Sequence, residues 1–369
     1  MLQVCGITYD HTVNYGSCLQ AYALQRAIES STLSDGSKCL YQLIPIRAFE
    51  DWPVKAKVSM ERILVLPLLS LHRTQFSGFE KNHIRYAPVK RMGELPSLNE
   101  KTDAFVCGSD VIWNPDLNCH LNAFYLDFAE KYKFSYAASF GKAEVSDQML
   151  TTIRPFLEKL DAISVRERSG AEIVKRCVDK PVQVVSDPVL LLKREEWDSF
   201  IPAAEPSKGY IFVYITHLSS TVQSVLEELR RKTGLKIVYA ANGPKQALKQ
   251  GMLQVQKPQR WLQQLRDAEY VVTNSFHATA FSVLFHKKFF TVVNGDKAKG
   301  INIRMNDFLN SLGLGDRIHS SVPEEIDLGE VNYSGVDEKI AALREESLLF
   351  LRENLEAAYR QKKESEAKQ

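Results

Sequence analysis

A short apolar run leads into a helix through small polar residues at positions 270–282, and this junction constrains the fold more than any other part of the chain. Thr273, Asn274 and Ser275 follow the apolar residues, and His277 comes two residues after Ser275. Small polar side chains cap helices, and the free amides of a first helical turn bind anions. The junction predicts a parallel α/β unit with His277 beside an anion site. An ordinary turn between a strand and a helix in a βαβ unit has a similar pattern, so an anion site and a purely structural turn both stay open.

Short strands alternate with amphipathic helices along the whole chain. In the first half, the pattern predicts a helix at residues 17–30 and strands at 4–8, 39–44, 104–108, 134–141, 162–167 and 182–185. In the second half, it predicts helices at 220–233 and 260–266 and strands at 210–216, 236–240, 270–273 and 288–293. Alternation of this kind is typical of parallel sheets covered by helices.

The length of the chain indicates two domains. Its 369 residues, 44% of them hydrophobic, exceed one typical small domain and supply two cores. Prolines and charged residues between positions 193 and 209 predict a linker. We therefore expect a first domain at residues 1–192, a second at 210–335, and an amphipathic C-terminal helix from 336 whose charged end, from 361 to 369, is frayed.

Charge and cysteine content limit the class of protein. The chain has 47 Lys and Arg against 45 Asp and Glu, a net charge of +2, which does not indicate a nucleic-acid-binding protein. Six cysteines occur without a CxxC pair and are expected to be reduced. The N-terminus reads as a strand and not as a signal peptide, so we expect a cytoplasmic enzyme. An apolar run at residues 63–69, flanked by basic residues, predicts either a packed helix or peripheral contact with a membrane surface.

Two polar segments follow predicted strands in the first half and suit the binding of sugar hydroxyls. The first contains His11, Asn14 and Tyr15, and the second contains Ser109, Asp110 and, three residues later, Trp113. Loops at strand ends collect the side chains of α/β active sites. Turn geometry alone accounts for the first segment equally well, and Asp110 is also suited to cap the next turn.

Other residues are candidates for binding an anion. Arg166 lies near the end of a predicted strand, and Arg304 follows the last one. Guanidinium groups pair with carboxylate or phosphate through two parallel hydrogen bonds. A surface salt bridge between Arg166 and Glu167 is the alternative. The chain has no metal-ligand spacing, no GxGxxG and no GxSxG, so we expect a reaction without a metal, a dinucleotide or a serine nucleophile.

Six segments, in this order along the chain, resemble the polysaccharide pyruvyl transferase family: residues 14–25, 108–114, 135–141, 164–167, 187–188 and 273–277. The resemblance covers most of the chain, from Gly6 to Leu314. It implies two Rossmann-like domains facing a cleft, as in GT-B glycosyltransferases. It also implies transfer of the enolpyruvyl unit of phosphoenolpyruvate to two hydroxyls of a sugar, with loss of phosphate. No cofactor is expected, because phosphoenolpyruvate is a co-substrate, and the acceptor is expected to be a sugar or a lipid-linked oligosaccharide of a bacterial surface-polysaccharide pathway.

The resemblance also implies where the donor binds. The histidine motif of the second domain, with Asn274, Ser275 and His277, is expected to hold phosphoenolpyruvate together with Arg166. Other members of the family carry an arginine two residues before that histidine, where this chain has Ser275. We expect Arg304 to replace it.

The chemistry of an enol ether suggests the catalytic roles. Protonation of C3 makes C2 electrophilic, so a general acid must reach the methylene carbon while a sugar hydroxyl attacks. We assign His277 as that acid and Asp110 as the base. Two alternatives remain: a nucleotide-sugar glycosyltransferase that uses the same kind of cleft, and a catalytically silent member that only binds a sugar or an anion.

Overall fold

The computed structural model describes residues 1–9, 14–46, 49, 73–116, 121–204, 209–216, 218–241, 256–293, 299–321 and 325–368. His11 and the apolar run at 63–69 lie outside these residues. No helix within them is long and apolar enough to cross a bilayer.

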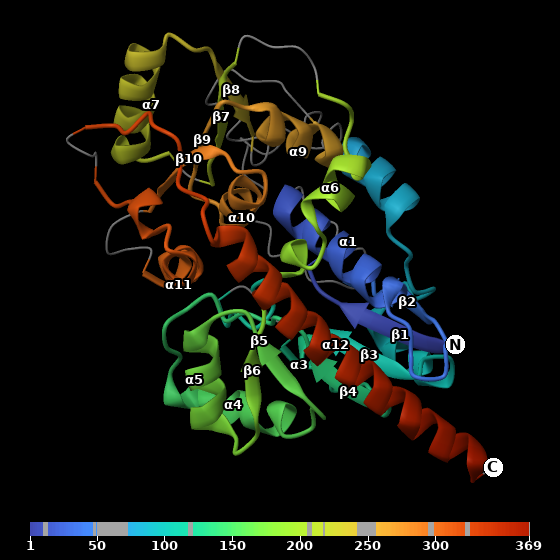
Figure 1. Ribbon diagram of the computed structural model, residues 1–369. Coiled ribbons are helices and arrows are strands. Elements are labelled where there is room, and N and C mark those ends of the chain that lie inside the picture. Colours follow the sequence, from blue (N-terminus) through green and yellow to red (C-terminus); the bar gives the residue numbers. More distant parts are fainter. Residues whose placement is uncertain are drawn as a thin grey trace, which may run out of the picture.

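The first half of the chain builds a parallel sheet in the order β2-β1-β3-β4 (Figure 1). Its strands are β1 (Leu2–Ile7), β2 (Cys39–Leu43), β3 (Ala104–Cys107) and β4 (Tyr132–Ser135). A parallel pair, β5 (Ile163–Val165) and β6 (Val182–Val184), continues the sheet through a bridge between Phe134 and Ala162. The strands β1 and β3 are apolar and buried, as expected for a sheet with helices on both faces.

Helices and short 3-10 turns connect these strands. They are α1 (Tyr15–Ser30), η2 (Met92–Glu100), α3 (Leu121–Phe124), α4 (Asp147–Leu157), α5 (Arg168–Cys177), η3 (Pro188–Leu190) and α6 (Arg194–Phe200). Asn14 starts α1 by accepting hydrogen bonds from the amides of Gly16 and Ser17. The helix α6 lies in the range expected to be a linker, and its Trp197 is fully buried. The chain therefore packs tightly where it passes between the two sheets.

The second half repeats the architecture of the first. Its strands are β7 (Ile211–Tyr214), β8 (Ile237–Ala240), β9 (Tyr270–Thr273), β10 (Lys288–Val292) and β11 (Ile318–His319). Their order is β11-β10-β9-β7-β8, and all pairs are parallel. The connecting elements are α7 (Ser220–Thr233), α9 (Pro258–Asp267), α10 (Phe276–Leu284), α11 (Lys299–Leu312) and η5 (Gly315–Arg317). In each half, the first strand lies between the second and the third.

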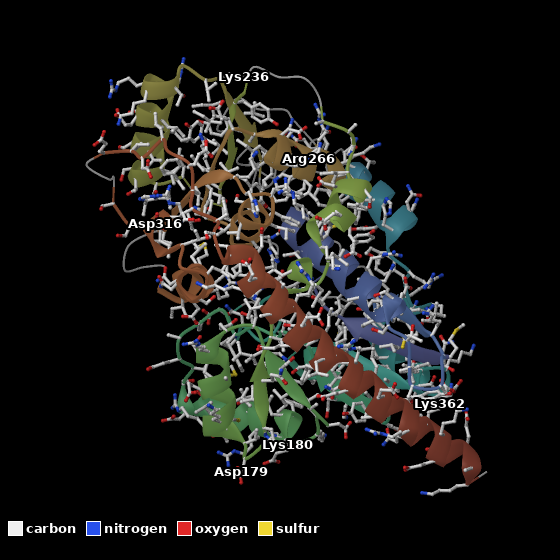
Figure 2. The ribbon with its side chains drawn as sticks, in the orientation of Figure 1. Asp179, Lys180, Lys236, Arg266, Asp316 and Lys362 are labelled. Carbon is white, nitrogen blue, oxygen red and sulfur yellow. The ribbon has the colours of Figure 1, made fainter. Side chains whose placement is uncertain are left out.

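The last helix, α12 (Val336–Ala367), returns from the second half and runs along the first (Figure 1). The hydroxyl of Tyr132 donates to Asn354 Oδ1 at 2.8 Å. Lys362 lies near the end of the helix (Figure 2). Its Nζ lies 2.9 Å from Asp103 Oδ2. Because of such contacts the helix continues to Ala367, beyond residue 361, where we expected it to fray.

Aromatic rings fill the core where the two halves meet. Tyr15 of α1 stacks on Trp261 of α9, with the ring centroids 5.1 Å apart, and Tyr214 lies edge-on to both rings. Tyr15 and Trp261 are 0% exposed. Tyr15 is therefore a core residue, and our expectation that it contacts a sugar is wrong. A large planar ring gains more by burial than its hydroxyl gains by facing a ligand.

We expect Trp261→Ala to destabilise the protein by about 3–5 kcal/mol, because it removes the largest ring of this core and leaves a cavity. Urea unfolding at constant protein concentration measures the change. The control is Leu349→Ala on α12, whose side chain is 50% exposed and which should change the stability little. Equal effects of the two substitutions would contradict the assignment of Trp261 to the shared core.

Candidate active site

The order of the strands determines where polar side chains gather. Connections diverge from the carboxyl ends of β1 and β3 in the first half, and from β7 and β9 in the second, which leaves a crevice at each point. The segment beginning at Asn14 follows β1, and Asp110 follows β3. His277 follows β9, in the first turn of α10. The two crevices thus bring the polar segments of both halves together.

A buried cluster of charged groups joins the two halves at this place. Arg166 Nη1 lies 2.6 Å from Asp187 Oδ2, and the same oxygen lies 3.4 Å from His277 Nε2. Arg166 Nη2 lies 3.9 Å from Asp110 Oδ1. All four residues are buried, with exposures of 1–8%. Three predicted site residues, Asp110, Arg166 and His277, therefore meet in the structure.

Asp110 is held as a carboxylate. Ser17 Oγ donates to its Oδ2 at 2.6 Å, and the amide of Val111 donates to its Oδ1 at 2.8 Å. Burial opposes the charge of Asp110, but the charges of His277 and Arg166 and the hydrogen bond from Ser17 more than offset it and lower the pKa of the carboxyl group. Asp110 is thus ionised at neutral pH, as a base must be. The same interactions make it a weaker proton acceptor than a free aspartate.

Asp187 is a member of the site that our sequence analysis did not select. Its Oδ1 accepts from the amide of Val189 and starts the turn η3, while its Oδ2 faces Arg166 and His277. Burial opposes its charge, but His277 and Arg166 lower its pKa far below the usual range of a carboxyl group. The only sequence signal was an aspartate followed by a proline at the end of a predicted strand.

Gly16 allows His277 to approach the first half closely. A Cβ atom on Gly16 would lie 2.2 Å from His277 Nδ1, closer than any real contact. The backbone of Gly16 is not in the left-handed region, so close approach and not turn geometry requires a glycine here. One edge of the imidazole ring thus rests on α1, while Nε2 points toward Asp187.

Arg304 lines a cavity next to this cluster. The cavity, of about 220 Å³, lies between the halves and is lined by residues that include Arg166, Asp187, Phe276 and Arg304. Burial, and after it the charge of Arg166, lower the pKa of the Arg304 guanidinium to about 10. The structure therefore places the two predicted arginines at one cavity.

Asn274 and Ser275 support the turn before α10. Asn274 Oδ1 accepts from the amide of Thr216 at 2.7 Å, which ties the ends of β7 and β9 together. The amide of Ser275 donates to Thr273 Oγ1 at 3.0 Å. Ser275 is the N-cap residue of α10, although its side chain makes no capping hydrogen bond. Their contact with the donor stays a prediction.

Two further acceptor residues that we predicted pack inside the first half instead. The Trp113 side chain is 1% exposed, stacks on Tyr125 with centroids 4.9 Å apart, and donates from Nε1 to the Phe124 carbonyl. Ser109 is 0% exposed, and its hydroxyl donates to the carbonyl of Ala137. Our expectation that they bind a sugar is therefore wrong. Both sit at a strand end, but their side chains point into the core and not toward the crevice.

Two parallel sheets of the same order, meeting at a polar cleft, define an α/β protein of the GT-B type. A putative UDP-N-acetylglucosamine 2-epimerase from Listeria monocytogenes superposes with a TM-score of 0.52 at 10% identity, covering 96% of this chain and 90% of that one. MnaA from S. aureus with UDP (TM-score 0.49, 10% identity, coverage 97% and 91%) and heptosyltransferase WaaC from E. coli with ADP (0.40, 13%, 93% and 100%) are also similar. No curated protein matches the sequence.

The sequence itself identifies the family. The model of the polysaccharide pyruvyl transferase family matches residues 14–296, which is more than half of the chain, so the protein belongs to that family. The matched residues include most of the polar cluster: Ser17, Asp110, Arg166, Asp187 and His277.

Proposed function

We propose that the protein transfers the enolpyruvyl unit of phosphoenolpyruvate to two hydroxyls of a sugar, forming a pyruvate ketal and releasing phosphate. The observation that supports this most is that Arg166 lines one cavity with Arg304 and pairs with Asp187, which also contacts His277. Phosphoenolpyruvate carries a phosphate and a carboxylate close together, and such a ligand needs several convergent cationic donors. Membership of the family supports the same reaction class.

The arginines have hydrogen-bonding capacity to spare. Among the described residues, Arg166 Nε and Nη2 and Arg304 Nε are buried without a hydrogen-bond partner. Unpaired buried N–H groups are costly, and an anionic ligand would satisfy them. Arg304 of α11 lines the same cavity as Arg166. This supports our expectation that Arg304 takes over the role of the arginine that other members of the family carry at the position of Ser275.

The cluster can perform the proton transfers. His277 gives a proton to C3 of the donor, while an acceptor hydroxyl attacks C2 and loses its proton toward Asp110. The C2–O bond to phosphate then breaks, and the oxocarbenium centre is closed by the second hydroxyl, whose proton leaves with the phosphate. Asp187, whose Oδ2 lies 3.4 Å from Nε2, stabilises the cationic form of the imidazole.

The test is phosphate release with phosphoenolpyruvate and a panel of sugars and lipid-linked oligosaccharides. The proposal predicts one phosphate per acceptor and an acceptor mass gain of one pyruvate less one water. Binding is measured separately, as the rise in melting temperature with phosphoenolpyruvate and with UDP. If UDP alone stabilises the protein and a nucleotide sugar is turned over, the protein is a glycosyltransferase and the proposal is wrong. If phosphoenolpyruvate binds but no acceptor causes release of phosphate, the protein is a catalytically silent member of the family.

We expect Arg166→Lys to weaken binding of phosphoenolpyruvate by about 10-fold or more. Lysine keeps a positive charge beside Asp187, but it lacks the planar set of N–H groups with which arginine forms two parallel hydrogen bonds to an anion. The structure makes lysine a better test than alanine, since Arg166→Ala would deprive the buried Asp187 of its nearest cation, at a cost of up to about 3–5 kcal/mol. The dissociation constant from calorimetry measures the effect. Unchanged donor affinity in a folded Arg166→Lys protein would remove Arg166 from the donor site.

A further inference from the structure

We infer that the cavity at the N-terminus of α5 is a phosphate subsite, which holds the phosphoryl group of the donor and the phosphate that leaves. The inference rests on the proposed function for the identity of the donor. Its core, the binding of a phosphate ion between α5, β6 and α11, can be measured without turnover. Figure 1 shows α11 of the second half facing α5 and β6 of the first.

The start of α5 offers backbone donors. Glu167 is the N-cap residue of this ten-residue helix and makes no capping hydrogen bond with its side chain. Its Oε1 instead accepts from the hydroxyl of Ser139 and the amide of Phe140. The amides of the first turn thus have no side-chain cap, and Glu167 and Arg168 at this turn line the cavity. Such a helix start favours an anion by its amides and by its dipole.

Side chains in the cavity lack acceptors independently of the helix. Arg166 has a side chain that is 2% exposed, and its Nε and Nη2 have no hydrogen-bond partner within the described part of the chain. The same holds for Arg304 Nε and for the hydroxyl of Ser186, and all three residues line the cavity. Guanidinium nitrogens can only donate, so the missing ligand must accept hydrogen bonds. A phosphate has enough oxygen atoms to satisfy this set.

Three carboxylates also line the cavity and limit how the anion can sit. Asp187 is engaged by Arg166, His277 and the amide of Val189. Glu167 uses one oxygen for Ser139 and Phe140, and its Oε2 lies 4.0 Å from Arg166 Nε. Together with Asp307 they balance the charges of Arg166, Arg168 and Arg304. Binding therefore depends on directed N–H and O–H groups and not on a net positive charge.

The position of the subsite fits the direction of the reaction. Arg166 contacts both the cavity and Asp187, and Asp187 contacts His277. The guanidinium of Arg166 is fixed over the ring of Phe276, 4.8 Å from the centroid. A donor with its phosphoryl group at α5 would thus extend past Arg166 toward His277, where the proton is delivered. Phosphate leaving C2 would stay paired with the arginines.

The experiment uses inorganic phosphate as the probe and the full-length protein. We expect phosphate to raise the melting temperature and to inhibit competitively against phosphoenolpyruvate. Ser186→Ala and Arg304→Gln should each weaken phosphate binding about 10-fold or more. Ser186→Ala is the cleaner variant, because the hydrogen bonds of Ser186 to Tyr136 and Ser347 use its backbone and remain. The matched control is Arg176→Gln, which removes a half-exposed arginine at the other end of α5 and should not change phosphate binding.

The outcomes separate the subsite from the function. Phosphate affinity that is unchanged in both variants, or absent in the wild type, would overturn the subsite even if pyruvyl transfer occurs. Phosphate binding that is lost in both variants and kept in Arg176→Gln supports it, even if phosphoenolpyruvate is not turned over. Pyruvate is the carboxylate probe: if Arg304→Gln and Ser186→Ala abolish binding of pyruvate but not of phosphate, the cavity is a carboxylate site and the inference is wrong.

Discussion

His277→Ala is expected to lower turnover by about 10²–10⁴-fold, the usual contribution of a positioned general acid. The fold should survive, because Asp187 keeps its short ion pair with Arg166 when the imidazole is removed. Binding of phosphoenolpyruvate should persist through Arg166 and Arg304. The measurement is phosphate release at saturating donor, with thermal melting as the folding control.

The carboxylates of the cluster predict how turnover depends on pH. Burial opposes the charges of Asp110 and Asp187, but neighbouring cations more than offset it and lower both pKa values, so neither carboxylate changes its charge between pH 5 and 8. Because a lowered pKa means that protonation occurs only at lower pH, we expect these carboxylates to cause no loss of turnover in this interval. Initial rates of phosphate release across the interval measure it.

A second histidine, just beyond the end of the same helix, makes the test specific. His286 lies just after α10 and pairs with Asp337 at 2.8 Å, away from the cluster. His286→Ala should leave turnover unchanged. Equal turnover in His277→Ala and wild type would end the assignment of His277 as the acid.

Gly16→Ala is expected to lower turnover by about 100-fold with a smaller effect on stability. The new methyl group would lie 2.2 Å from His277 Nδ1, so the imidazole or α1 must move. A displacement of about 1 Å at a reacting group costs about 10²-fold in rate. Overpacking costs about 1–3 kcal/mol, part of which the higher helix propensity of alanine offsets, since Gly16 lies in the first turn of α1.

The control for Gly16 is a glycine with free space around it. A Cβ on Gly78 would meet nothing within 4 Å. Gly78→Ala should therefore keep full turnover, while Gly16→Ala should lose turnover and retain its melting temperature to within several degrees. Full activity of Gly16→Ala would show that the close contact with His277 is not needed for catalysis.

These two predictions show how the site depends on residues of both halves. His277 belongs to the second half, and Gly16 and Asp187 belong to the first. His277 was recognisable from the sequence because an apolar strand is followed directly by polar residues at the N-terminus of a helix. Gly16 belonged to a polar segment that turn geometry also explained, and Asp187 was recognised only as part of a motif. Their roles appear when the two crevices face each other, because neither contact is local in sequence.

The same distinction explains the acceptor residues that we predicted wrongly. Trp113 and Tyr15 follow strands, as residues of an α/β active site do, but their rings complete the cores of the protein. Position along the chain indicates which residues lie near a strand end. It does not indicate which way a side chain points there, since that depends on the neighbouring helices.

The sequence by itself determined the alternation of strands and helices, the family, and the candidates Asp110, Arg166 and His277. Periodicity reports whether each side chain faces solvent or core, and this is a local property. Only the tertiary structure decided that Asp187 joins Arg166 to His277, that Gly16 supports the imidazole, and that Arg304 reaches the cavity of Arg166. Those contacts depend on the order of the strands and on the packing of one half against the other, which bring together residues far apart in the chain.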